Sequence, residues 1–314
     1  MQRTSSTSVI RVAATALAAA CTLVTIAKAQ DAAPQAASAT PGAPAVRGFT
    51  PLVVRQVKPG LYMLFGDGGN AVLRVADDGL ILVDTKLGGD QIYQELMAKI
   101  RSVSDKPIKY VFVTHVHNDH SGNTAQFETA GIPVIASDDY KGMIPTYVLH
   151  PGETRSPLPT ISFAKSYTVK LKGAVATAYA VHPAHTASDS IVYFPDLKTV
   201  AMGDNMFPGA PNADWSNGGR LLGVKQNWAE LEKLDFDTLI PGHGNALVSR
   251  AEFEEDRKKL DVLIERIRAA IKSGVPKSEL LASIKVDDLG WNIKDSRDWN
   301  RPERVDGLYA ELSK

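Results

Sequence analysis

One short stretch constrains the fold of this chain more than any other. Three of its seven histidines and an aspartate fall within six consecutive positions, at His115, His117, Asp119 and His120. The β-rich run 109–113 ends just before them, so we expect the cluster to leave a strand end as a loop. In a continuing strand these four side chains could not all point the same way. Imidazole and carboxylate together suit zinc and related first-row ions, whereas calcium prefers oxygen ligands.

Three further candidate ligands lie downstream, each at the end of an apolar run. They are His185 after 175–181, Asp204 after 199–202 and His243 after 238–240. Glycines next to the last two would let the backbone pass close to a metal ion. Several strand-end positions that share one chemistry predict a pocket along one edge of a sheet.

The apolar periodicity elsewhere predicts a layered α/β domain. Four short apolar runs between 53 and 83, separated by Gly- and Asp-rich turns, are typical of an antiparallel meander. A helix is expected over 89–103 and a long amphipathic helix over 250–273. Between them we expect further strands, including one over 162–171. Strands, helix, strand and helix occur in this order twice, which predicts two sheets packed face to face with helices outside.

Taken in order, these motifs resemble those of the metallo-β-lactamase superfamily. The HxHxDH loop is followed by His-Thr at 185–186, Gly-Asp at 203–204 and Pro-Gly-His-Gly at 241–244. Asp84 ends the apolar run 80–83, as the family's aspartate does upstream of the first helix. The resemblance covers about residues 70–243. It implies an α/β fold, a four-layered αβ/βα sandwich of two mixed sheets with helices outside.

The resemblance also implies a centre of two zinc ions, for which iron or manganese are the alternatives. Its implied ligands are His115, His117 and His185 on one ion, Asp119, His120 and His243 on the other, and Asp204 bridging both. Asp119 and Asp84 are the candidate catalytic carboxylates. Asp84 is expected to act from behind the ligands by orienting one of them.

The implied reaction is hydrolysis, in which a hydroxide shared by the two ions attacks an ester, thioester, lactone or β-lactam carbonyl of a small-molecule substrate. Asp204 stands where β-lactamases of this superfamily usually have Cys or Ser. This favours a general hydrolase, with a dedicated, antibiotic-degrading β-lactamase as the alternative. An iron-dependent redox protein of the same fold is the alternative from another class of function.

The first 47 residues are expected to lie outside the folded domain. Residues 1–29 carry basic residues, the apolar run 12–26 and a small-x-small site, a pattern that predicts an export signal and a periplasmic or secreted protein. The alternative is a lipoprotein anchored through Cys21. Residues 30–47 are rich in Ala and Pro and predict a flexible linker. Residues 48–314 are expected to form a single hydrolase domain.

The charge and the apolar runs limit the possible partners. The 35 basic residues balance 35 acidic ones, so no nucleic-acid partner is expected. The apolar run 12–26 is short for a membrane span. The oligomeric state stays open, because periodicity does not separate a core face from a dimer contact.

Two loops are expected to border the pocket. The segment 207–223 is rich in Gly, Pro and Asn and begins three residues after Asp204, with Phe207 and Trp215 as candidate apolar walls. The Gly-rich loop 66–70 is expected to cover the other side.

Overall fold

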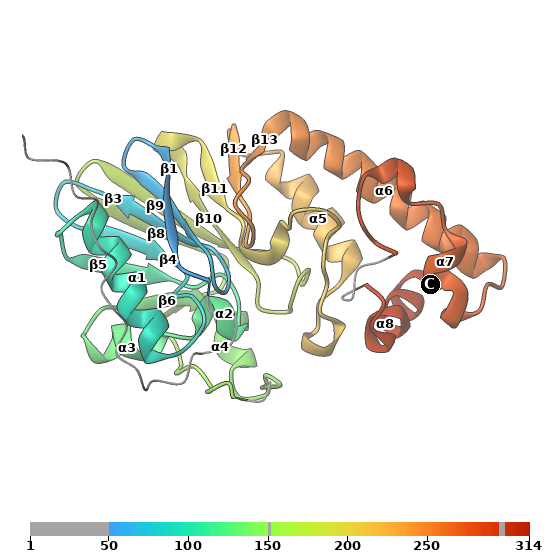
Figure 1. Cartoon of the computed structure of the whole chain (residues 1–314), viewed down its shortest axis with the longest axis horizontal. Coiled ribbons are helices and arrows are strands. Elements are labelled where there is room, and N and C mark those ends of the chain that lie inside the picture. The colour runs from blue at the N-terminus through green and yellow to red at the C-terminus, as the bar shows by residue number, and fades with distance from the viewer. Residues whose placement is uncertain (1–49, 150–151, 295–298) are drawn as a thin grey trace, which may run out of the picture. The chain divides into compact units, whose positions relative to one another are not determined.

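Two β-sheets form the centre of the computed structural model, which describes residues 50–149, 152–294 and 299–314 (Figure 1). The first sheet contains, in chain order, β1 (Val53–Lys58), β2 (Leu61–Phe65), β3 (Ala71–Val75), β4 (Leu80–Val83), β5 (Ile108–Phe112), β6 (Val134–Ser137) and β7 (Ile161–Phe163). Neighbours from β1 to β4 are antiparallel, and neighbours from β4 to β7 are parallel. The predicted export signal and linker, 1–47, lie outside the described residues.

The second sheet has the strand order β13-β12-β11-β10-β9-β8. Its strands are β8 (Ser166–Leu171), β9 (Ala174–Ala180), β10 (Ser190–Phe194), β11 (Thr199–Ala201), β12 (Thr238–Ile240) and β13 (Val248–Ser249). All neighbours are antiparallel except β11 and β12, which are parallel. Both sheets are therefore mixed, as the sequence predicted.

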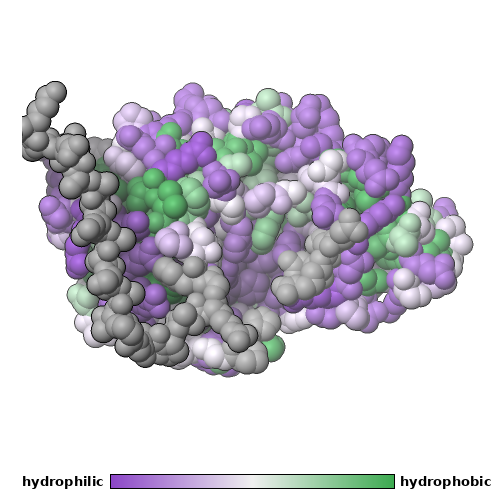
Figure 2. Space-filling view, in the orientation of Figure 1, coloured by the Kyte–Doolittle hydropathy of each residue, from purple (hydrophilic) through white to green (hydrophobic). Residues whose placement is uncertain are grey.

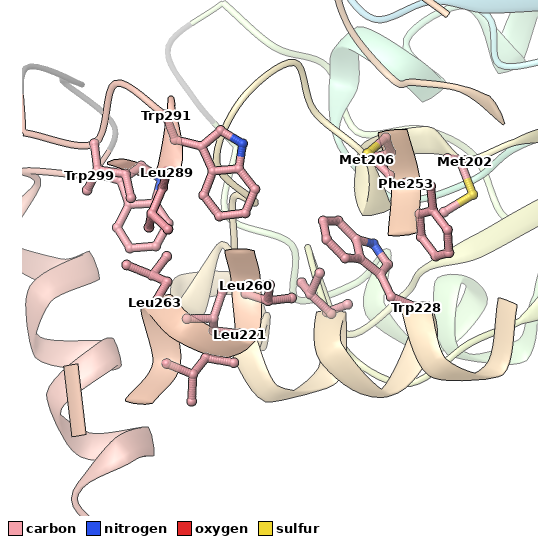
Figure 3. Close-up of a cluster of buried hydrophobic side chains, with 14 of the residues drawn as sticks. Met202, Met206, Leu221, Trp228, Phe253, Leu260, Leu263, Leu289, Trp291 and Trp299 are labelled. Carbon is pink, nitrogen blue, oxygen red and sulfur yellow. The ribbon is translucent and has the colours of Figure 1, made fainter. Parts of the chain in front are cut away.

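Three apolar layers hold the sheets and helices together. Buried side chains of both sheets, such as Phe112 and Phe194, pack against one another between the sheets. The outer face of the first sheet packs against α1 (Asp90–Val103), α3 (Thr124–Thr129) and α4 (Asp138–Met143). The outer face of the second packs against α5 (Leu221–Leu231) and α6 (Arg250–Lys272), and α7 (Leu280–Ser283) and α8 (Pro302–Leu312) pack in turn against α6 (Figures 1 and 3). The order helices, sheet, sheet, helices confirms the predicted αβ/βα sandwich.

The helices form where the sequence offers an apolar stripe and a cap. In α1 the residues Ile92, Leu96 and Ile100 recur at helical spacing and are buried against the first sheet. The long helix α6 begins with a capping box, in which the Ser249 hydroxyl accepts a hydrogen bond from Glu252 N–H. The Glu252 carboxylate in turn accepts one from Ser249 N–H at 2.8 Å. These reciprocal bonds satisfy backbone donors that the first turn leaves free.

The expectation of one strand over 162–171 is wrong. The segment is two strands in different sheets, since β7 pairs with β6 in the first sheet and β8 pairs with β9 in the second. The chain passes from one sheet to the other at Ala164 and Lys165. Neither glycine nor proline marks this crossing, so the apolar alternation reads as continuous.

None of the helices within the described ranges combines the length and the apolar character needed to cross a membrane. The face seen in Figure 2 is mainly hydrophilic, and its hydrophobic residues are gathered in separate patches. The described residues belong to one compact unit.

The core beneath α6 gives a direct test of this architecture. The Phe253 side chain is fully buried, with ring centroids 5.7 Å from Trp228 and 5.5 Å from Phe236 (Figure 3). We expect Phe253→Ala to lower the free energy of unfolding by about 3–5 kcal/mol, because it removes apolar contacts and leaves a cavity. Val53 lies on β1 and is 47% exposed. Val53→Ala should therefore change the free energy of unfolding by less than about 0.5 kcal/mol. Urea denaturation measures both, and equal effects of the two substitutions would contradict this packing.

Candidate metal centre

The predicted ligands lie in loops at the ends of strands from both sheets. His115 follows β5, and the short helix α2 (Asn118–Ser121) carries Asp119 and His120. In the second sheet Asp204 lies in a 3₁₀ turn, η2 (Gly203–Asn205), after β11, and His243 follows β12. Since β4 and β5 are parallel neighbours, as are β11 and β12, their carboxyl ends open at the same edge of each sheet. The fold thus brings distant parts of the chain to one place.

The side chains form two adjacent groups of potential metal ligands. The three-histidine cluster consists of His115, His117 and His185, with Asp204 beside it, and the second cluster consists of Asp119, His120 and His243. Within each group the potential ligand atoms lie within 4.8 Å of one another. All seven predicted ligands therefore converge, and the two clusters are consistent with a binuclear metal site. The role of each residue as a ligand stays a prediction.

Asp204 is the residue that both clusters share. Its Oδ2 lies 3.2 Å from His185 Nε2 in the three-histidine cluster and 3.3 Å from His243 Nε2 in the second cluster. Burial acts to raise the pKa of Asp204, but the neighbouring imidazoles of His120, His243 and His185 outweigh it and hold the pKa well below its usual range. The side chain is therefore an anionic carboxylate between the clusters, as a bridging ligand must be.

A buried nitrogen without a partner supports the presence of a cation. His115 Nε2 is buried and makes no hydrogen bond, although it faces the cluster. A buried polar atom left unpaired costs free energy, and coordination to a metal ion removes that cost. The donor set of imidazoles and carboxylates, free of thiolates, fits first-row divalent ions.

Asp84 supports ligands of both clusters from behind. Its Oδ2 lies 2.8 Å from His120 Nδ1 and accepts a hydrogen bond of 2.9 Å from the Thr114 hydroxyl. The same hydroxyl lies 3.0 Å from His115 Nδ1. Asp84 is 2% exposed and has a left-handed backbone, with φ of 61°. This placement agrees with the orienting role expected for Asp84, since a fixed Nδ1 leaves Nε2 for the metal.

The loop 66–70 packs against the second cluster. The Gly69 α-carbon approaches His120 so closely that a Cβ would lie 2.1 Å from Nε2, and Gly69 N–H donates to Asp119 O at 3.0 Å. The fully buried Lys86 side chain donates to Gly69 O. Burial lowers the pKa of Lys86 to about 8, against the attraction of Asp119 and other carboxylates. The hydrogen bond from Lys86 to Gly69 O therefore holds this loop on the centre.

Sequence reasoning missed Asp214, which supports the three-histidine cluster. Asp214 Oδ2 lies 2.9 Å from His117 Nε2, and the Asn212 carbonyl lies 2.6 Å from His185 Nδ1. Burial raises the pKa of Asp214, but hydrogen bonds from His117 and Asn217 more than offset it, and the pKa falls below its usual range. The sequence Asp-Trp-Ser-Asn does signal a capped turn, yet nothing in it indicates which histidine the carboxylate meets.

A cavity of about 230 Å³ opens next to His117 and Asp119. Its other walls include Tyr147, Val148, Trp215, Arg301 and Arg304. Trp215 thus borders a cavity at the site, whereas the Phe207 ring stacks on His243, with centroids 5.0 Å apart. The two arginines come from the C-terminal region, which the motif pattern did not include.

Comparison with known proteins agrees with this geometry. The family model of the metallo-beta-lactamase superfamily matches residues 64–243. Over 208 residues the chain is 27% identical to the 2,4-dinitroanisole O-demethylase subunit alpha of Nocardioides sp. (strain JS1661), covering 63% of this chain and 59% of that protein. Over 259 residues it is 24% identical to a linear primary-alkylsulfatase of Pseudomonas sp. (strain ATCC 19151). This match covers 67% of this chain and 49% of that protein. This chain spans about half the length of these curated relatives.

Two solved structures show the same fold. A metallo-beta-lactamase from Pontibacter korlensis has a TM-score of 0.59 and 19% identity, covering 67% of this chain and 99% of that one. A stereoselective inverting sec-alkylsulfatase from Pseudomonas sp. has a TM-score of 0.63 and 20% identity, covering 83% of this chain and 49% of that one. At these identities the likeness concerns the fold alone.

The position of Asp84 leads to a testable expectation. Asp84→Asn keeps the size of the side chain and tolerates the left-handed backbone, but its amide donors would face the donors of Thr114 and His120. We expect the affinity for metal to fall about 10–100-fold. Competition with a chromogenic chelator measures this. Asp78→Asn, which alters an exposed carboxylate bound to Lys172 N–H, serves as the control. An unchanged affinity in Asp84→Asn would refute the orienting role.

Proposed function

Because this chain belongs to the metallo-beta-lactamase superfamily, we propose that it is a metal-dependent hydrolase that binds two ions, zinc in the native protein, and acts on a small molecule. The observation that carries the proposal is the convergence of two His/Asp clusters on one buried carboxylate, Asp204. A protein with one structural zinc would need a single closed set of four ligands.

The residues of the site would have three roles: to bind the metal ions, to orient the ligands and to transfer a proton. Bound metal ions would supply Lewis-acid activation of water and of the bond to be cleaved. Asp204 would hold the two ions together, and Asp84 would orient His120. The Asp119 side chain is 29% exposed and lines the cavity, so it is placed to accept a proton from the attacking water.

The cavity limits the size of the substrate. The volume of about 230 Å³ is below the range of about 300–1,000 Å³ that is common for ligand pockets. Tyr147, Val148 and Trp215 offer apolar contacts to the part of the substrate that remains outside the metal centre. This supports a small ester, thioester, lactone or β-lactam. Asp204, in the place of Cys or Ser, favours a general hydrolase over a dedicated β-lactamase.

Alkyl sulfate esters are a second candidate class of substrate. A linear primary-alkylsulfatase is among the relatives of this chain, at 24% identity over 259 residues. Arg301 and Arg304 line the cavity, and guanidinium groups match the geometry of an oxyanion such as sulfate. The cavity wall also contains Glu153 and Glu303, so an alkyl chain with an anionic head would have to place that head on the guanidinium side.

We further propose that the hydrolase acts after export. The basic, apolar and small-residue order of 1–29 supports cleavage before Gln30. Mass spectrometry of the protein from both the membrane fraction and the membrane-free fraction should find a mature chain beginning at Gln30. A chain beginning with an acylated Cys21 would replace this proposal by the lipoprotein alternative, and an uncleaved Met1 would refute export.

One screen tests the hydrolase proposal. The purified protein should hydrolyse at least one compound among esters, lactones, thioesters, β-lactams and alkyl sulfates. We expect a chelator to remove at least about 90% of this activity and zinc to restore it, because the reaction depends on the ions. Sulfate release from alkyl sulfates alone would select the second candidate. Bound iron with oxygen consumption and no hydrolysis would overturn both candidates in favour of a redox protein.

A further inference from the structure

The C-terminal helix α8 lies against the turn that supports two of the predicted ligands, and it also contacts the start of α5. We propose that α8 is a positioning element for the three-histidine cluster, acting through Trp215 and Asp214. This inference rests on the metal-dependent function proposed above. It assigns a role to a part of the chain that supplies none of the seven predicted ligands.

The first step of the connection is the contact between Asp214 and His117. His117 Nδ1 faces the cluster, 2.9 Å from His185 Nε2, while Nε2 faces Asp214 Oδ2 at 2.9 Å. A carboxylate at Nε2 keeps the proton on that nitrogen and leaves the lone pair of Nδ1 for a metal ion. Asp214 N–H also donates to His185 O at 2.7 Å. The position of Asp214 therefore sets the orientation of His117 and the path of the His185 loop.

The second step is the short 3₁₀ turn η3 (Trp215–Asn217), which Asp214 caps. Asp214 Oδ1 accepts a hydrogen bond from Ser216 N–H at 3.0 Å, and Oδ2 accepts one from Asn217 Nδ2 at 2.6 Å. Because both oxygens of the carboxylate are bound to η3, a displacement of the turn displaces the group that orients His117. Whatever fixes Trp215, the first residue of the turn, therefore fixes Asp214.

The third step is the clamp that α8 places on the Trp215 ring. Trp215 Nε1 donates to Glu311 Oε2 at 2.9 Å. One turn earlier on the same helix, the Gly307 backbone contacts the indole ring. A Cβ at this position would lie 2.3 Å from Trp215 Cγ. The helix thus needs glycine at 307 for the ring to take this position.

Glu311 also fixes the far end of the same loop. Its carboxylate accepts hydrogen bonds from Leu221 N–H at 3.0 Å and from Leu222 N–H at 2.8 Å, at the first turn of α5. The residue that precedes α5, Arg220, provides no side-chain cap of its own. An anionic group at a helix N-terminus satisfies free backbone donors and interacts favourably with the helix dipole. One side chain of α8 therefore holds both the turn at 215 and the start of α5.

The second cluster takes its support from elsewhere in the chain. Gly69 and Lys86 hold the loop 66–70 on Asp119 and His120, and Asn70 Nδ2 donates to Pro241 O and Gly244 O, both at 2.9 Å, on either side of His243. A disturbance of α8 should consequently weaken the three-histidine cluster and spare the second cluster. This asymmetry separates a positioning role from a general contribution to stability.

Gly307→Ala is the most specific test. Alanine favours a helix more than glycine does, so the substitution does not weaken α8 itself, but its Cβ must displace the Trp215 ring. In a titration of the metal-free protein with cobalt, competed by a chelator, we expect two binding steps in the wild type. In Gly307→Ala one step should weaken about tenfold or more, and the other should not change. Equal weakening of both steps, or of neither, would overturn the proposal.

Two further variants guard against a folding defect. Glu311→Gln keeps the size of the side chain but brings an amide donor toward the donors of Trp215 and α5, so the same single step should weaken. Asp306→Asn lies on the same helix and removes only an exposed ion pair with Lys277 at 2.8 Å. Both binding steps should remain as in the wild type. A selective loss in Asp306→Asn as well would assign the effect to helix stability and overturn the proposal.

A second readout does not depend on metal. In the metal-free wild type, ¹H–¹⁵N correlations of the imidazoles should find His117 protonated at Nε2 with a slowly exchanging proton, because Asp214 accepts it. Gly307→Ala should abolish that slow exchange, and an unchanged His117 signal would refute the connection. If the wild type bound no metal, the proposed function would fail, and this readout would still decide whether α8 positions His117.

Discussion

The structure depends on the contact of one buried carboxylate with imidazoles that arrive from two directions. Asp204 Oδ2 lies 3.2 Å from His185 Nε2 and 3.3 Å from His243 Nε2. These ligands follow strands of the second sheet, whereas the cluster at 115–120 follows β5 of the first sheet. The centre therefore exists only where the edges of both sheets meet. Five imidazoles and two carboxylates crowded at one point without a cation would carry unpaired polar atoms, as His115 Nε2 illustrates.

Asp84 supports ligands of both clusters, but each cluster also has a support of its own, and these two supports differ in kind. The second cluster is supported by the loop that follows β4. In this loop Asp84 and Lys86 both have a left-handed backbone, with φ of 61° and 67°. A non-glycine residue holds such a conformation only when its surroundings fix it, and the bonds of Asp84 to Thr114 and His120 do so. The three-histidine cluster rests instead on an irregular loop, 207–219, which the C-terminal helix braces.

Periodicity was sufficient to predict two sheets with helices outside, and the close spacing at 115–120 was sufficient to predict a metal site. The full set of seven predicted ligands came instead from the resemblance of the motifs to those of the superfamily. The meander before Asp84 and the helix 89–103 appear as expected, and the HxHxDH loop leaves the end of β5. The break between β7 and β8 was missed because no glycine or proline marks it. Asp214 was missed for a different reason, since it meets His117 across 97 positions of sequence. A contact of that kind leaves no local pattern, and the same holds for Glu311 at the start of α5.

We propose above all that two ions occupy this centre and share Asp204. Anomalous diffraction at metal absorption edges, from crystals of protein purified without added metal, tests this most directly. We expect two peaks, one among His115, His117 and His185 and one among Asp119, His120 and His243, with the carboxylate of Asp204 between them. A signal at the zinc edge would also identify the metal. A single peak, or two peaks that do not both contact Asp204, would contradict the account.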